Sequence, residues 1–134
     1  MKADRIFETV LYAEDLNAAK TFYSDVLGLS LYRESEYFLV YRLESSALLI
    51  FDPKLSAEDG RPVPSHGAKG QGHIAFAASD DQIEAWRKYF LSKGIPIDEV
   101  VKWSEGGKSV YVRDPAGNSI EFAPSTLWGG NWDF

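Results

Sequence analysis

The sequence predicts an α+β fold in which two βαβββ modules pair to form a cleft. In each half of the chain a strand-like run is followed by an amphipathic helix, and three further strand-like runs come after it. Gly28 and Gly94 follow the two helices at corresponding positions. Repeats of one supersecondary unit commonly bury a shared face, and a cleft between repeated halves is a common place for a ligand. We therefore expect one domain over residues 1–134 with a ligand site between its modules.

The first module is expected over residues 5–53. Its first strand runs from Ile6 to Ala13, and Asp15 is a suitable N-cap for the helix that follows. Gly28 then provides the C-terminal stop. The helical stripe consists of Leu16, Ala19, Phe22, Tyr23, Val26 and Leu27. Three strands should follow, around Leu29 to Arg33, around Tyr37 to Leu43, and from Ala47 to Phe51.

The second module is expected over residues 72–123. A strand from His73 to Ala78 precedes Ser79 and Gln82, which fit a capping box at the start of a helix. The helical stripe consists of Ile83, Trp86, Arg87, Phe90 and Leu91, and Gly94 ends it. Strands should follow at Ile95 to Val101, Ser109 to Val112 and Ser119 to Phe122, with a turn from Asp114 to Asn118 before the last one.

Two segments lie outside the modules. Residues 54–71 are rich in proline and glycine, so we expect a loop that forms a lid or a partner contact, with His66 in a solvent or lid role. Residues 124–134 form an aromatic, glycine-rich tail. Because exposed aromatic groups at that density usually cover something, we expect the tail to dock on its own domain or on a dimer partner.

Composition limits the classes of function. The 134-residue chain has a formal net charge of −6 and no basic stripe, which argues against a nucleic-acid partner. It has no cysteine, so disulfides and thiolate ligands are excluded. No apolar run approaches the roughly 20 residues needed to cross a bilayer, and we expect no signal peptide, because residues 1–5 contain no apolar h-region. We expect a cytoplasmic protein that acts on a small molecule and forms a homodimer.

Three ionisable side chains occupy matching strand positions in the repeat. Glu8, His73 and Glu121 each lie within an apolar run, where burial without a partner costs several kcal/mol. Alternation along a strand places the three on the face opposite the bulky apolar residues. Those bulky sets, which should pack under the helices, are Phe7 and Leu11, Ile74 and Phe76, and Ile120 and Phe122. The three ionisable groups should therefore point together into the cleft.

Two carboxylates and one imidazole in one place suggest a divalent metal site. Without a cation, one carboxylate would take up a proton or the imidazole would become charged. A metal removes this conflict, and Mn²⁺, Fe²⁺, Ni²⁺, Co²⁺ or Zn²⁺ suits an oxygen-rich set with one nitrogen. The alternative is a hydrogen bond between one Glu and the His without metal, with the other Glu at a solvent-facing strand end.

Four further side chains are candidates for contact with a substrate. Tyr12 shares the strand face of Glu8, and Tyr111 and Arg113 alternate with Val110 and Val112. Tyr111 and Arg113 could contact an anionic or polar substrate, although Arg113 could equally pair with a surface acid. Trp103 could stack on a ligand or simply pack.

The motifs resemble the vicinal oxygen chelate superfamily, also called the glyoxalase/bleomycin resistance/dioxygenase superfamily. The segment from Tyr12 to Leu29, with its FY…VLGL ending, is similar to the family's first helix. Residues 72–76 resemble the strand that opens the family's second module, and residues 114–122 resemble its DP-x-G-N-x-I-E terminus. The resemblance implies a metal held by Glu8, His73 and Glu121 that chelates two oxygens of a substrate.

Two departures from the family pattern narrow the reaction. Glu8 stands where the family usually has His or Gln, which counts against a dioxygenase or a fosfomycin-resistance transferase. Glyoxalase I also has a Glu ligand on its fourth strand, whereas Ala47 to Phe51 carries none and Asp52 is out of register. Three ligands leave open coordination positions, which catalysis needs.

Three interpretations of the function remain open from the sequence. The first is a metal-dependent enzyme of lyase, isomerase or dioxygenase type that acts on a small oxygen-rich substrate. The metal would act as a Lewis acid, and Glu8 or Glu121 would move a proton. The alternative is a metal-free binding protein that sequesters a small molecule, as bleomycin-resistance proteins do. A purely structural or regulatory partner protein is a third, weaker interpretation.

Overall fold

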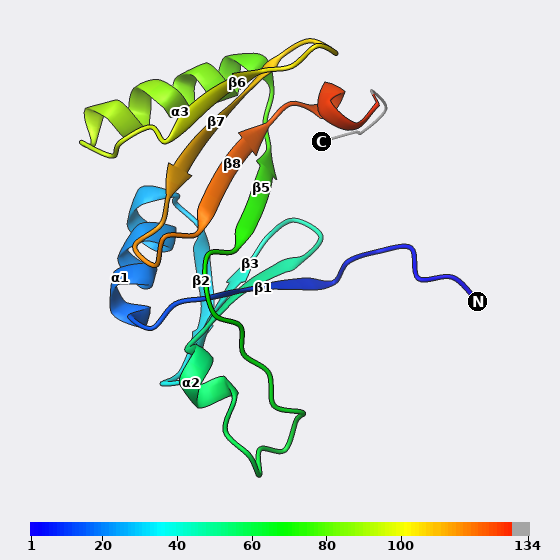
Figure 1. Cartoon of the computed structure of the whole chain (residues 1–134), viewed down its shortest axis with the longest axis vertical. Coiled ribbons are helices and arrows are strands. Elements are labelled where there is room, and N and C mark those ends of the chain that lie inside the picture. The colour runs from blue at the N-terminus through cyan, green and yellow to red at the C-terminus, as the bar shows by residue number, and fades with distance from the viewer. Residues whose placement is uncertain (130–134) are drawn as a thin grey trace. The chain divides into compact units, whose positions relative to one another are not determined.

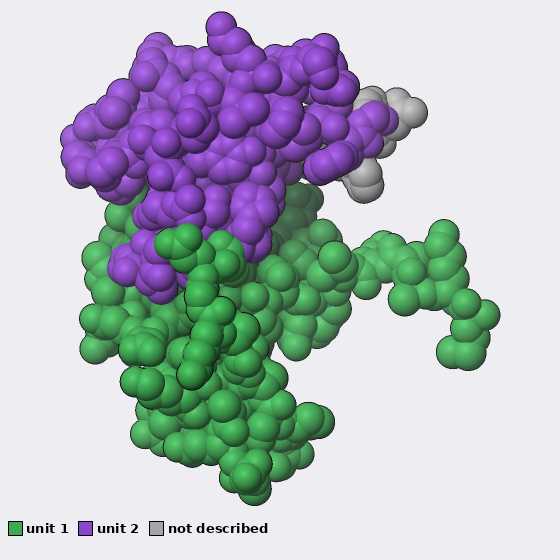
Figure 2. Space-filling model, in the orientation of Figure 1, with its two compact units in different colours: residues 1–72 green, residues 73–134 purple. Residues whose placement is uncertain are grey.

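The computed structural model describes residues 1–129, and the chain divides into two compact units. The first is Met1–Gly72 and the second is His73–Phe134, coloured separately in Figure 2. No helix in residues 1–129 is both long enough and apolar enough to span a membrane.

The first unit contains one four-stranded mixed sheet with short helices (Figure 1). Its elements are β1 (Glu8–Tyr12), α1 (Leu16–Lys20), the π-helix η1 (Thr21–Val26), β2 (Ser30–Glu34), β3 (Phe38–Arg42), β4 (Ala47–Phe51) and α2 (Pro53–Ser56). The strand order is β1-β4-β3-β2, and β1 runs parallel to β4. The remaining pairs are antiparallel.

The second unit repeats this topology. Its elements are β5 (His73–Ala77), α3 (Asp80–Ser92), β6 (Glu99–Lys102), β7 (Lys108–Arg113), β8 (Ser119–Ala123) and the 3₁₀-helix η2 (Ser125–Trp128). The strand order is β5-β8-β7-β6, with β5 parallel to β8. Both units therefore have the strand–helix–three-strand order, and the predicted α+β fold of two βαβββ modules is confirmed.

The second unit shows how the sequence pattern determines its core. The Ser79 side chain accepts a hydrogen bond from the backbone of Gln82, and the Gln82 side chain accepts one from the backbone of Ser79, so the predicted capping box is present. On the covered face of the sheet, Trp86 of α3 packs against Phe122 of β8 with ring centroids 4.5 Å apart. Phe76 of β5 stacks on the same ring at 5.5 Å. The opposite face of β5 and β8 is thereby left to His73, the alanines and Glu121.

Four details differ from the expectations. The first predicted helix is divided between α1 and η1, because the Leu27 amide bonds the Phe22 carbonyl in a wider turn that allows Phe22 and Tyr23 both to be buried. The predicted loop 54–71 is helical at its start, because residues 54–56 belong to α2, where Pro53 holds the first helical position and the Asp52 side chain caps the amides.

The other two differences concern strand ends. Phe7 does not pack under a helix, because β1 begins only at Glu8 and the Phe7 side chain is 77% exposed. The strand predicted from Ile95 begins instead at Glu99. The Ile95 amide bonds the Phe90 carbonyl at the end of α3, and Pro96 has no amide to donate to a neighbouring strand.

Candidate metal and substrate site

His73 and Glu121 lie close together on adjacent parallel strands of the second unit. In the β5–β8 register His73 is opposite Ser119 and Ala75 is opposite Glu121, so both functional side chains are on one face. Nε2 of His73 lies 3.3 Å from Oε2 of Glu121. The Glu121 side chain is only 6% exposed, whereas the His73 ring is 52% exposed. The pair therefore combines a buried carboxylate with an imidazole that solvent can reach.

The backbone of β8 determines which nitrogen of His73 carries a proton. Nδ1 lies 3.2 Å from the carbonyl oxygen of Ser119, and a carbonyl oxygen can only accept, so Nδ1 donates. In the neutral ring this leaves a lone pair on Nε2, the nitrogen that lies 3.3 Å from Oε2 of Glu121. Two lone pairs at that distance repel each other unless a proton or a cation lies between them.

Tyr111 provides the second contact to Glu121. The two residues are opposite each other in the β7–β8 register, and the Tyr111 hydroxyl donates a 2.7 Å hydrogen bond to Oε1. The Tyr111 ring also stacks near that of His73, with centroids 6.4 Å apart. Burial, and next the hydrogen bond to Glu121, raise the pKa of Tyr111 to about 12. Tyr111 is thus a neutral phenol at physiological pH, and it can keep donating to the carboxylate.

The donor chemistry of this pair fits a divalent cation. An imidazole nitrogen whose partner nitrogen bonds a backbone carbonyl is the usual arrangement of a metal-binding His. Two ligands with bonds of about 2.1 Å in tetrahedral geometry are separated by about 3.4 Å, close to the 3.3 Å between Nε2 and Oε2. Within residues 1–129, however, no group of three or more His, Asp or Glu side chains is assembled for a metal.

Glu8, the predicted third ligand, belongs to the first unit. It is exposed at the start of β1 and pairs in register with Ala47 of β4. Its role as a ligand stays a prediction. Asp52 is occupied elsewhere, because its carboxylate accepts from the amides of Lys54 and Leu55 at the start of α2. The first unit therefore shows no substitute for the ligand that the sequence lacks on β4.

Tyr12 has a partner, His66, that was not expected from the sequence. Its hydroxyl lies 2.7 Å from Nδ1 of His66, and the His66 ring meets Phe51 edge-on at 4.7 Å. His66 is half-buried through these contacts, so the solvent role is wrong, whereas the lid role stays a prediction. Tyr12 and Phe51 are opposite each other in the parallel register. That pairing forms an aromatic platform at the strand ends, and it is the signal that could have placed His66.

Arg113 and Trp103 have structural partners in the second unit. Arg113 forms an ion pair with Asp98 at 2.8 Å and also donates to the Gly117 carbonyl, which is the alternative that the sequence left open. The indole of Trp103 donates to the Ser109 hydroxyl at 2.8 Å. Contact of either residue with a substrate stays a prediction.

Comparison with known proteins identifies the family. The profile of the Glyoxalase/Bleomycin resistance protein/Dioxygenase superfamily matches residues 5–122. The chain belongs to this superfamily. The resemblance seen in the motifs is thereby confirmed, and so is the fold that it implied.

Three proteins, one of them compared as a solved structure, illustrate what the chain is similar to. The crystal structure of lactoylglutathione lyase from Agrobacterium tumefaciens superposes with a TM-score of 0.92 at 41% identity, covering 96% of this chain and 99% of that one. Lactoylglutathione lyase from Haemophilus influenzae is 34% identical over 128 residues, 88% of this chain and 90% of that protein. Virulence protein STM3117 from Salmonella typhimurium is 32% identical over 133 residues, 92% and 85% of the two chains.

Proposed function

We propose that the protein is a metal-dependent lyase-type enzyme of the glyoxalase superfamily. Its substrate would be a small oxygen-rich molecule that presents two adjacent oxygens to a divalent metal. The observation that carries the proposal is the His73–Glu121 pair, whose Nε2 and Oε2 atoms face each other at 3.3 Å while Nδ1 is bonded to the Ser119 carbonyl. Two relatives at 34% and 41% identity are lactoylglutathione lyases, which favours the lyase type.

Three side chains of the protein would hold the metal. His73 would offer Nε2 to the metal, with the ring held by the Ser119 carbonyl. Glu121 would offer Oε2, while its other oxygen stays bonded to Tyr111. Glu8 would complete the set from the first unit. A bound divalent ion would supply Lewis-acid polarisation of a substrate carbonyl.

Proton transfer would fall to the carboxylates. Glu121 or Glu8 would take a proton from the carbon beside the polarised carbonyl and return it to the adjacent carbon. The Tyr111 hydroxyl would remain a donor throughout, because its pKa of about 12 keeps it protonated. Its hydrogen bond to Oε1 would hold the Glu121 side chain in place while Oε2 leaves the metal and takes the proton.

An activity assay tests the proposal. Protein that has been stripped with chelator and reloaded separately with Ni²⁺, Co²⁺, Zn²⁺, Mn²⁺ or Fe²⁺ is mixed with the hemithioacetal of methylglyoxal and glutathione, and growth of the thioester absorbance is followed. We expect metal-dependent turnover that Glu121→Gln and Glu8→Gln each reduce, while Glu44→Gln on an exposed turn has no effect. Turnover equal with and without chelator would overturn the proposal.

A second candidate is a binding protein without catalysis. The observation that favours it is that Glu121 already has partners in the protein, with Tyr111 on one oxygen and His73 on the other. In that case one proton shared between His73 and Glu121 would take the place of the metal. Affinity for a small apolar ligand would then be unchanged by chelator.

A further inference from the structure

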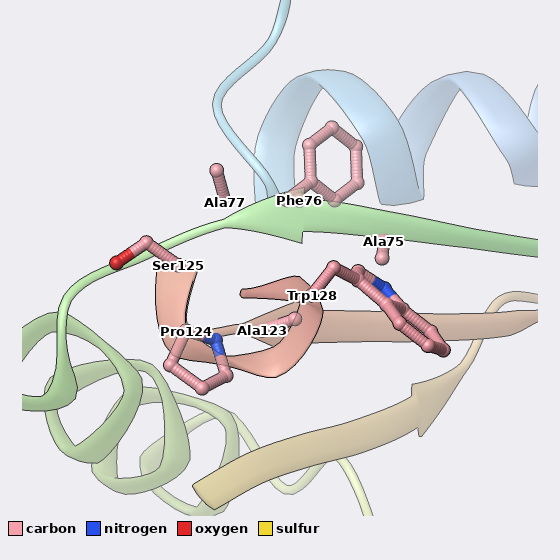
Figure 3. Close-up of a pocket in the computed structure, with 7 residues that line it drawn as sticks. All are labelled: Ala75, Phe76, Ala77, Ala123, Pro124, Ser125 and Trp128. Carbon is pink, nitrogen blue, oxygen red and sulfur yellow. The ribbon is translucent and has the colours of Figure 1, made fainter. Parts of the chain in front are cut away.

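An apolar groove lies beside the His73–Glu121 pair in the second unit. Its volume is about 220 Å³, and none of its lining residues is charged. Figure 3 shows the lining, which consists of Ala75, Phe76, Ala77, Ala123, Pro124, Ser125 and Trp128. An apolar cavity of about 150 Å³ accommodates a benzene molecule. The groove is therefore large enough for one aromatic ring or a short aliphatic chain.

The strand register connects this groove to the site. Ala75 and Ala77 alternate along β5 on the face of His73, and Ala123 follows Glu121 on the same face of β8. Ala75 is the register partner of Glu121, and Ala77 is the partner of Ala123. The small methyl groups leave space above the sheet directly beyond the carboxylate. A group attached to a molecule bound at the pair would reach this space without crossing another strand.

Trp128 forms a wall of the groove, and the segment that carries it is anchored. The Thr126 hydroxyl donates to the Gly106 carbonyl in the turn between β6 and β7. Gly107 in the same turn lies so close to Pro124 that a Cβ atom there would be 3.0 Å from Cγ of the proline. Trp128 itself is 78% exposed although it follows these anchors. Its indole lines the groove, and an indole offers a large apolar ring for contact with a ligand.

We propose that this groove is the subsite for an apolar substituent of the substrate, an aromatic ring or a short branched aliphatic chain next to the chelated oxygens. This inference rests on the proposed function, since it places the oxygens at His73 and Glu121. It specifies the class of substrate further, because none of the seven lining residues carries a charge that would offset the charge of an ionised substituent.

Two hydroxamic acids test the subsite in the metal-loaded protein. Acetohydroxamic acid and benzohydroxamic acid chelate a metal through the same two oxygens and differ in the methyl or phenyl substituent. Partial burial of the phenyl ring should make benzohydroxamic acid bind about ten-fold more tightly. Ala77→Leu fills the groove at an exposed position and should remove this difference, and Trp128→Ala should reduce it. Ala85→Leu, the same change on the exposed surface of α3, should leave it intact.

The outcomes separate the subsite from the metal site. Equal binding of the two acids, or a preference that survives Ala77→Leu, would overturn the subsite. If neither acid binds the loaded protein, the proposed function fails.

A measurement on metal-free protein then tests the groove by itself. Benzamide and acetamide are titrated into protein that chelator has stripped of metal, and binding is followed by NMR. Shifts of the Ala75, Ala77 and Ala123 methyls with benzamide alone would support an apolar site, and their absence would overturn it.

Discussion

Tyr111 and Glu121 are opposite each other on β7 and β8, and the phenol donates a 2.7 Å hydrogen bond to one oxygen of the buried carboxylate. The other oxygen faces His73. The two oxygens of Glu121 therefore have separate tasks, one fixed by the protein and one directed toward the site.

Removing the Tyr111 hydroxyl should weaken metal binding. In Tyr111→Phe the Glu121 carboxylate loses the donor that orients it, and loss of such an outer partner typically lowers metal affinity about 10–100-fold. Competition with a chromophoric chelator measures the affinity. Tyr32→Phe, at a tyrosine exposed on β2, is the control. An unchanged affinity in Tyr111→Phe would show that Tyr111 does not position the ligand.

His66 should hold the segment after α2 against the sheet of the first unit. His66→Ala removes the hydrogen bond with Tyr12 and the ring contact with Phe51. We therefore expect the free energy of unfolding to fall by about 1–2 kcal/mol. Urea denaturation measures the change. Val63→Ala, at an exposed side chain of the same segment, should change little. Equal stability of the two variants would contradict a packing role for His66.

Glu84 should make stability depend on pH. Hydrogen bonds from Arg87 and then Lys108 lower the pKa of Glu84 from 4.5 to about 2. The folded state therefore binds this proton less readily than the unfolded chain. The stabilisation is complete above pH 4.5 and is lost as the pH falls toward about 2.

Thermal unfolding of Glu84→Gln tests this dependence. The variant should melt below the wild type at neutral pH, and the gap should narrow between pH 4.5 and about 2. Added salt should narrow the gap as well, since the ion pairs are partly exposed. Glu44→Gln is the control. A gap that stays constant over this pH range would contradict the assignment.

Gly107 should tolerate alanine less well than Gly106. Both glycines have positive φ, 99° for Gly106 and 81° for Gly107, so alanine is strained at either position by about 1–3 kcal/mol. Only at Gly107 would the new methyl also meet Pro124 and Asp80. The free energy of unfolding should therefore fall further in Gly107→Ala than in Gly106→Ala. An equal decrease in the free energy of unfolding in the two variants would mean that the turn is not in close contact with the segment before Trp128.

The repeat made most of the fold predictable from the sequence. Strand alternation and capping residues act locally, so β4, β5, β8 and the start of α3 were placed within a residue. The π-helical turn at η1 was not predictable from the 3.6-residue stripe, because it depends on packing two adjacent aromatic residues, Phe22 and Tyr23, into one core.

The site was predictable only in part. Alternation correctly put His73 and Glu121 on one face, because both residues lie inside regular strands. The Tyr111–Glu121 bond needed the antiparallel register of β7 and β8, which the sequence does not state. The His66 contact and the groove beside Trp128 arise from irregular segments that fold back on a sheet, and no periodic signal marks such contacts.

Metal content is the most direct test of the central claim. Purified protein is stripped with chelator, reloaded with each transition metal in turn, freed of excess ion and measured by elemental analysis, alongside Glu121→Ala, His73→Ala and the control Glu105→Ala. The account predicts stoichiometric metal in the wild type and the control, and its loss in the two site variants. No metal in the wild type after reloading, or full metal in Glu121→Ala, would contradict it.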